Sequence, residues 1–234
     1  FELDRHPERA LITGHAGVPV VLETWRASGA GAVLDQLLPK KRKGLPASHL
    51  VEAALALIVV GGDTVEDLDL LRQDAALSLL LGFSVPAAQT FRDFLETFHE
   101  PDVPLLWQGP KAAIQDEGER LEALRQANAR LIAFARERFA AKTATIDLDA
   151  TILESRKRAA LPTYKGGKGY QPVVALWHEL GGIVADEFRD GNVPAAVGNQ
   201  HVIRQALAQV QGVAQVYLRA ASAPYDHAAL ALLE

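Results

Sequence analysis

The sequence contains no cysteine, and this absence excludes disulfide bonds, thiolate zinc sites and cysteine nucleophiles. Long hydrophobic runs are also lacking. The most apolar stretch, 53–60, is far shorter than the roughly 18 residues that a bilayer requires, and it ends at Gly61 and Gly62. We therefore expect neither a small secreted scaffold nor a membrane-spanning protein. With 234 residues, 49% of them hydrophobic, the chain can form one large globular domain or two small ones.

An excess of basic charge is missing as well. Lys and Arg number 24 against 29 Asp and Glu, which gives a net charge of -5. This balance excludes a basic coat of the histone kind, so any contact with nucleic acid must be made by local patches. The amino terminus, 1–5, has neither the pattern of a signal peptide nor an initiator methionine, and we expect the chain to be trimmed or partial.

Helical periodicity dominates the chain up to about residue 142. Prolines and glycines separate the periodic segments, and Thr64 with Asp67 has the spacing of a capping box. The apolar seam of the last segment favours packing within the chain over packing against a second subunit. We predict a helical region over 1–142, with helices at 20–38, 48–60, 64–81, 88–98 and 111–140.

Strand-like alternation replaces the helical pattern after residue 142. The pattern predicts strands at 144–152, 172–179, 182–188 and 215–219, and helices at 202–210 and 226–233. In this βββαβα order, three antiparallel strands are followed by a crossover helix that brings the fourth strand parallel to the first. The fold class is therefore α+β, and we expect the chemistry at the edge where the carboxyl ends of the first and fourth strands meet.

Two acidic residues, Asp147 and Asp149, lie within a strictly alternating segment. Ile146 and Leu148 share one face of the predicted strand, so both carboxylates project from the other face. Paired carboxylates are typical of a catalytic or metal site. An exposed strand face with solvated acids is an equal alternative at this stage, because Asp occurs mostly at strand edges and ends.

A basic segment, 155–170, follows this strand without any acidic residue. Its glycines let the backbone approach a polyanion, so we interpret it as a flexible DNA-binding arm, with a solvated hairpin tip as the alternative. The cations of this arm are Arg156, Lys157, Arg158, Lys165 and Lys168. A second basic patch at 40–43 lies in a proline-flanked linker and is equally well explained as a solvated turn.

The segment 85–94 has the pattern of the second helix of a helix-turn-helix motif. In that interpretation Gln89, Thr90 and Arg92 point outward to DNA. Phe91 and Phe94 would form its buried face, and a plain core helix explains them equally well.

Four motifs in one order give the sequence a family resemblance. They are Asp149-Ala150-Thr151, Lys168-Gly169-Tyr170-Gln171-Pro172, the run from Asp186 to Asn192, and Tyr217-Leu218-Arg219-Ala220 with Ser222. This set resembles the group-1 DDE transposases of bacterial insertion sequences, most strongly over 143–234. The resemblance implies that 143–234 is the amino-terminal portion of a ribonuclease-H-like catalytic domain. It also implies DNA strand cleavage and strand transfer at element ends.

The resemblance assigns the catalytic positions. It makes Asp149 the first metal-binding carboxylate, with Asp147 as a neighbouring candidate ligand. The second carboxylate of the family stands in an Arg-Ala-Asp-Ser motif, where this chain has Arg219-Ala220-Ala221-Ser222, so Ala221 replaces the acid. The third acid would fall beyond Glu234. A Mg²⁺ or Mn²⁺ cofactor is expected for the family, but this chain has one of the three ligands and is expected to be inactive.

The resemblance also implies partners: double-stranded DNA and a second copy of the chain, because cutting two element ends in one complex needs two active sites. The expected location is the bacterial cytoplasm. Three interpretations stay open from the sequence. They are an inactive transposase, a non-catalytic DNA-binding or dimerisation protein that occupies element ends, and an engineered inactive fragment.

Overall fold

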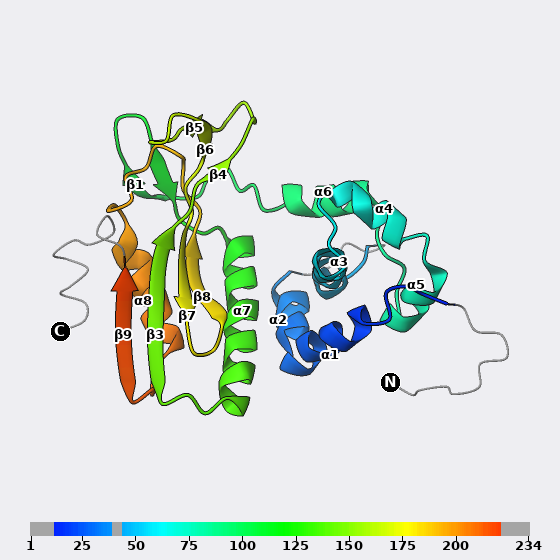
Figure 1. Ribbon diagram of the computed structural model, residues 1–234. Coiled ribbons are helices and arrows are strands. Elements are labelled where there is room, and N and C mark those ends of the chain that lie inside the picture. The colour runs from blue at the N-terminus through cyan, green and yellow to red at the C-terminus, as the bar shows by residue number, and fades with distance from the viewer. Residues whose placement is uncertain (1–11, 39–43, 221–234) are drawn as a thin grey trace. The chain divides into compact units, whose positions relative to one another are not determined.

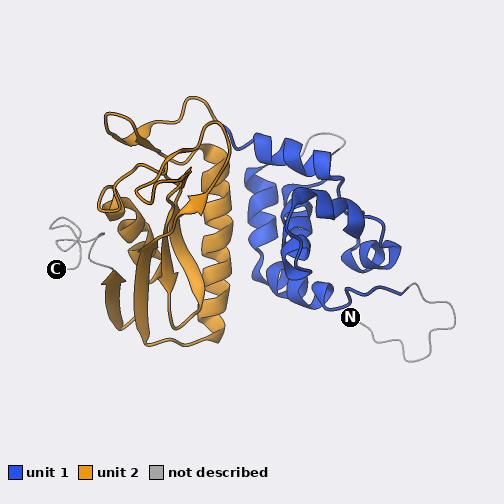
Figure 2. Cartoon of the chain, turned by 45° about the horizontal axis from the view of Figure 1, so that its top comes forward, with its two compact units in different colours: residues 1–99 blue, residues 100–234 orange. Residues whose placement is uncertain are grey.

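Two separate hydrophobic cores organise the chain, which divides into compact units 1–99 and 100–234 (Figure 2). The structure is a computed structural model that describes residues 12–38 and 44–220. The boundary between the units lies at residue 99, whereas the change of sequence pattern put it near 142. The long helix before residue 142 belongs with the sheet, because Ile132 is part of the second core and the Asn128 amide donates to the Ile183 carbonyl at 2.9 Å.

The first unit consists of helices in its described part. Its core is formed by apolar residues that include Leu22, Ala53, Leu68, Leu77 and Phe91. The helices are α1 (Val18–Ser28), α2 (Ala30–Leu37), α3 (Ala47–Val59), the 3₁₀ turn η1 (Val65–Asp67), α4 (Leu68–Leu71), α5 (Ala75–Leu81) and α6 (Ala88–Glu96). The helical character of this region is as the periodicity predicts.

Two of the predicted helices in this unit are broken into shorter ones. The helix predicted at 20–38 is split at Gly29, whose φ of 76° leaves the right-handed helical region. The helix predicted at 64–81 begins with the expected capping box of Thr64 and Asp67 but is interrupted before α5. There the Asp74 carboxylate accepts a hydrogen bond of 2.8 Å from the Leu77 amide and starts a new helix.

The helix predicted at 111–140 is shorter at its start, because a hairpin precedes it. Strands β1 (Leu105–Gln108) and β2 (Ala113–Gln115) pair antiparallel, and α7 spans Glu119–Arg138. Ile114, within the segment predicted as helix, is instead fully buried in β2. Arg136 ties α7 to the end of the next helix by donating to the Gln209 and Gln211 carbonyls, both at 2.7 Å. No helix in 12–38 or 44–220 is long and apolar enough to cross a bilayer.

A four-stranded sheet forms the centre of the second unit (Figure 1). Its strands are β3 (Thr143–Ala150), β7 (Val173–Trp177), β8 (Gly182–Glu187) and β9 (Gln215–Ala220), in the order β8-β7-β3-β9. The first three strands pair antiparallel, and after α8 (Asn199–Gln209) strand β9 returns parallel to β3. This confirms the predicted βββαβ order. The helix predicted at 226–233 lies outside the described residues.

The alternation along β3 sorts its side chains as predicted. Ile146 and Leu148 are buried in the second core, together with Val202, Ile203 and Ala206 of α8. Burial of each large apolar side chain contributes about 1.5–3 kcal/mol, which fixes the register of the strand. The acidic residues of β3 consequently project from the opposite face of the sheet.

Candidate active site

Asp149 lies one residue before the end of β3, opposite Val174 of β7. Its side chain is exposed and borders a cavity of about 700 Å³. The walls of this cavity come from the segment 162–171 and from the loop that follows β8, and they include Tyr164 and Asn192. Asp149 is therefore open to solvent and to a ligand.

The neighbouring parallel strand ends at the same edge of the sheet. The register of β3 and β9 pairs Leu148 with Ala220, the last described residue of β9. The carboxyl ends of the two strands thus meet where Asp149 stands, as the strand order predicted. Ala221 itself lies outside the described residues, so its position beside Asp149 stays a prediction.

A small three-stranded sheet adjoins this edge and contains the basic segment. It consists of β4 (Leu153–Glu154), β5 (Leu161–Pro162) and β6 (Lys168–Tyr170), in the order β4-β6-β5. The segment predicted as a flexible arm is therefore folded in part. Its backbone packs tightly, since a Cβ atom at Gly191 would lie 2.4 Å from the Gly169 carbonyl oxygen. We call this element, residues 153–170, the basic sheet.

The five cations of the basic sheet are exposed, and none of them forms an ion pair with a described residue. They are Arg156, Lys157, Arg158, Lys165 and Lys168. Unpaired cations keep their full charge available to a polyanion, so this surface suits phosphate groups.

A family model described as transposase DDE domain, group 1, matches residues 9–234. The chain belongs to this transposase family. The match confirms the resemblance seen in the sequence and identifies the β8-β7-β3-β9 sheet with α8 as the ribonuclease-H-like core of a DDE domain. It also indicates a DNA-acting enzyme of the nuclease or transferase class. Comparison with the curated proteins and with the solved structures gives no match.

DDE transposases generally use divalent metal ions, which acidic side chains hold. Over 12–38 and 44–220 no three His, Asp or Glu side chains gather in a group that could bind a metal. Of the two candidate ligands, Asp147 is engaged by Arg219, which leaves the exposed Asp149 as the candidate carboxylate at this edge. The described residues therefore do not fit a complete metal site.

The contact between Asp147 and Arg219 is a bidentate ion pair across the register of β3 and β9. The Arg219 Nε and Nη2 atoms donate to the two Asp147 oxygens at 2.5 and 2.7 Å. These hydrogen bonds lower the pKa of Asp147, and His178, whose Nδ1 lies 3.5 Å from Oδ2, acts in the same direction when protonated. We conclude that Asp147 joins β3, which carries Asp149, to β9.

Glu179 makes a similar structural contact on the same face of the sheet. Partial desolvation by itself raises the pKa of Glu179, but hydrogen bonds from the Thr145 hydroxyl and amide outweigh it and lower the pKa to about 2. Glu179 is therefore ionised and held by Thr145, near the end of β3 that lies opposite to Asp149.

Replacement of Asp147 by Asn should cost stability in a pH-dependent way. The folded pKa of Asp147 is below its unfolded value, so its stabilisation is present above about pH 4 and is lost as the pH falls through the folded pKa. We expect Asp147→Asn to lower the melting temperature slightly near neutral pH, as for an exposed ion pair, and less at acid pH. Circular dichroism melts of the variant and of Glu154→Gln, an exposed acid on β4, measure this. An equal deficit at both pH values would contradict the assignment.

The residues proposed for DNA reading in the helical unit are partly engaged by neighbouring acids. Arg92 forms an ion pair with Glu66, and the Gln89 amide donates to Asp93 at 2.7 Å, while Thr90 is exposed. The described part of this unit contains three arginines against ten acidic residues. These acids compete with DNA phosphates for Arg92 and Gln89, so α6 is a weaker candidate for DNA contact than the basic sheet.

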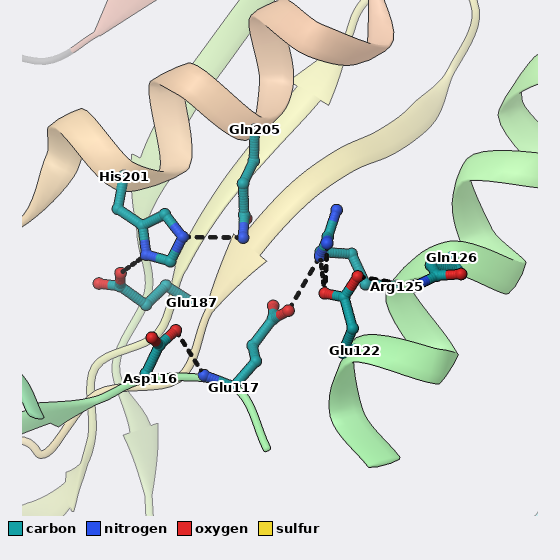
Figure 3. A network of polar contacts seen from close by, with 8 residues as sticks. All are labelled: Asp116, Glu117, Glu122, Arg125, Gln126, Glu187, His201 and Gln205. Carbon is teal, nitrogen blue, oxygen red and sulfur yellow. Dashed lines mark hydrogen bonds and ion pairs between the residues drawn. The ribbon is translucent and has the colours of Figure 1, made fainter. Parts of the chain in front are cut away.

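A second polar cluster, which sequence reasoning missed, is formed by Glu187 and Arg189 of the motif that begins at Asp186 and by His201 of α8; Figure 3 shows Glu187 and His201. Arg189 is 1% exposed and donates to Glu187 and, at 2.6 Å, to the Val197 carbonyl. His201 points its Nδ1 toward Glu187 at 3.4 Å. Burial lowers the pKa of Arg189, and Glu187 opposes that shift. This cluster fixes the loop between β8 and α8, which lines the cavity at Asp149.

Nearby, Arg125 of α7 lies between two glutamates (Figure 3). It donates to Glu117 at 2.9 Å and also binds Glu122. Burial raises the pKa of Glu117, and Arg125 acts against that rise. These contacts anchor the start of α7.

Proposed function

We propose that the chain is a transposase-family protein that binds double-stranded DNA across the basic sheet and presents it to the Asp149 end of β3. One observation carries this proposal. The basic sheet, which carries the five unpaired cations, lies beside the edge at which β3 ends (Figure 1), and its residues Pro162 and Tyr164 line the same cavity as Asp149. This arrangement suits a phosphodiester backbone held next to a catalytic carboxylate.

In a form of the protein with all its acidic ligands, the chemistry would be DNA strand cleavage and transfer at the ends of an insertion sequence, assisted by Mg²⁺ or Mn²⁺. In this chain Ala221 occupies the position of the second carboxylate, and a methyl group does not bind a cation. The chain as written therefore binds DNA without cutting it. A second copy would be needed to hold two element ends together, which supports a homodimer as the working complex.

The unmodified chain should bind supercoiled plasmid DNA without nicking it in the presence of Mn²⁺. The reason is that a single carboxylate does not retain two metal ions at the scissile phosphate. Agarose gels resolve the two effects, because binding retards the plasmid, whereas nicking leaves an open circle after the protein is removed. Asp149→Asn is the matched control for a contaminating nuclease. Nicking by the unmodified chain that Asp149→Asn abolishes would contradict the proposed inactivity.

A further inference from the structure

A groove on the second unit is separate from the cavity at Asp149. It has a volume of about 460 Å³ and shares no lining residue with that cavity. One wall is formed by residues 183–187, from β8. The other wall is one face of α7, where the lining residues have the spacing i, i+3, i+4 and i+7: Leu121, Leu124, Arg125 and Asn128. We call this hollow the β8 groove.

The strand in its wall, β8, lies at an edge of the sheet. Within the described part of the chain, the order β8-β7-β3-β9 gives it a strand partner on one side only. Helix α7 contacts it where the Asn128 amide donates to the Ile183 carbonyl at 2.9 Å. From Ile183 to Glu187 the strand lines the groove. Proteins add an extended peptide to a sheet at an edge of this kind, because the outer N–H and C=O groups are not used within the sheet.

Apolar side chains around the β8 groove are open to solvent. Their exposed fractions range from 40% to 59%, and they come from β1, α7, β8 and the residue after β8: Leu106, Leu121, Ile183 and Phe188. Large apolar groups that gather around one hollow are typical of a surface that binds another protein.

The polar part of the lining is acidic. It contains four carboxylates against one arginine and one histidine: Asp116, Glu117, Asp186, Glu187, Arg125 and His201. Figure 3 shows Asp116 and Glu117 with Arg125 on one side and with Glu187 and His201 on the other. This excess of negative charge repels phosphate groups and attracts a cationic partner.

Asp186 is the carboxylate through which a cation could bind. It is exposed, and it forms no ion pair or hydrogen bond with a described residue. Its charge adds to the burial effect that raises the pKa of Glu117, so the two carboxylates repel each other. A cation placed between them would relieve this repulsion.

We propose that the β8 groove binds an extended segment of a protein partner, in which lysine or arginine alternates with apolar residues. The backbone of the segment would add to the outer edge of β8, and its cation would pair with Asp186. The aliphatic stem of a lysine or arginine can lie along the exposed apolar rim while its charged end reaches the carboxylate. Such a site would give the chain a protein partner in addition to the DNA of the proposed function.

The test uses a fluorescently labelled peptide of alternating valine and arginine, whose binding to the full chain is measured by anisotropy. Asp186→Asn should raise its dissociation constant roughly tenfold, because one charge-assisted hydrogen bond is lost. Leu121→Lys should also weaken binding, since it places a like charge at the rim. Methylation of the peptide's valine amides keeps every side chain and removes backbone donors, so it should weaken binding as well. Glu154→Gln is the matched control, because Glu154 is an exposed acid outside the groove.

Three results would overturn the proposal. The first is equal affinity of the unmodified chain and Asp186→Asn for the peptide, or no binding by either. The second is equal affinity for the peptide and its methylated form, since strand addition needs the N–H donors. The third is a loss in Glu154→Gln as large as that in Asp186→Asn, which would show that only the overall charge attracts the peptide. None of these results bears on DNA binding by the basic sheet, which the DNA titrations measure separately.

Discussion

Replacement of the five cations of the basic sheet by glutamine is expected to weaken binding to duplex DNA by at least about a hundredfold at low salt. The positions are Arg156, Lys157, Arg158, Lys165 and Lys168, all exposed and unpaired in the structure. Each phosphate that a cation neutralises releases a condensed counterion and adds about 0.9 to the slope of log K against log salt. The slope should therefore fall by up to about 4.5 if all five make contact.

Titrations of both forms at several salt concentrations measure this effect. A control variant replaces Lys142 and Arg204, which are also exposed. Lys142 immediately precedes the first residue of β3, at the opposite end of the strand from Asp149. We expect the control to leave the slope unchanged. If the unmodified chain and the variant with all five substitutions give the same slope, the cations of the basic sheet do not contact DNA and are only solvated.

Local pattern predicted the sheet of the second unit well, because its strands alternate strictly and are separated by turn residues. Ile146 and Leu148 on one face and the acids on the other follow directly from the two-residue repeat. The helices were predicted less well where a single residue breaks them. A single glycine does not by itself end a helical pattern in the sequence, but Gly29 adopts a φ of 76° and separates α1 from α2.

Contacts between distant residues could not be predicted. Asp147 and Arg219 are 72 positions apart, so neither segment alone predicts their ion pair. Because of this ion pair, Asp147 is not available as a free metal ligand. The boundary of the units was misplaced for the same reason. The periodicity of α7 is a local property, but its membership of the second unit depends on Ile132 and on Asn128 reaching the sheet. Likewise, only the fold reveals that Arg189 is buried.

The substitution Ala221→Asp should create a divalent-metal site that the chain lacks. The register of β3 with β9 supports placing position 221 next to Asp149, since it pairs Leu148 with Ala220. A second carboxylate at that edge would raise the affinity for Mn²⁺ by roughly tenfold or more, because affinity rises with the number of charged oxygen ligands. Efficient strand transfer is not expected to return, because the two-metal reaction needs further ligands.

Calorimetric titration with Mn²⁺ tests the central claim, that Asp149 and position 221 form one metal site in a DDE domain. The account predicts that Ala221→Asp binds Mn²⁺ more tightly than the unmodified chain. Ala221→Asn, which has the same shape without the charge, should not gain affinity. Adding Asp149→Asn to Ala221→Asp should abolish the gain. Equal weak binding by the unmodified chain and by Ala221→Asp would contradict the account.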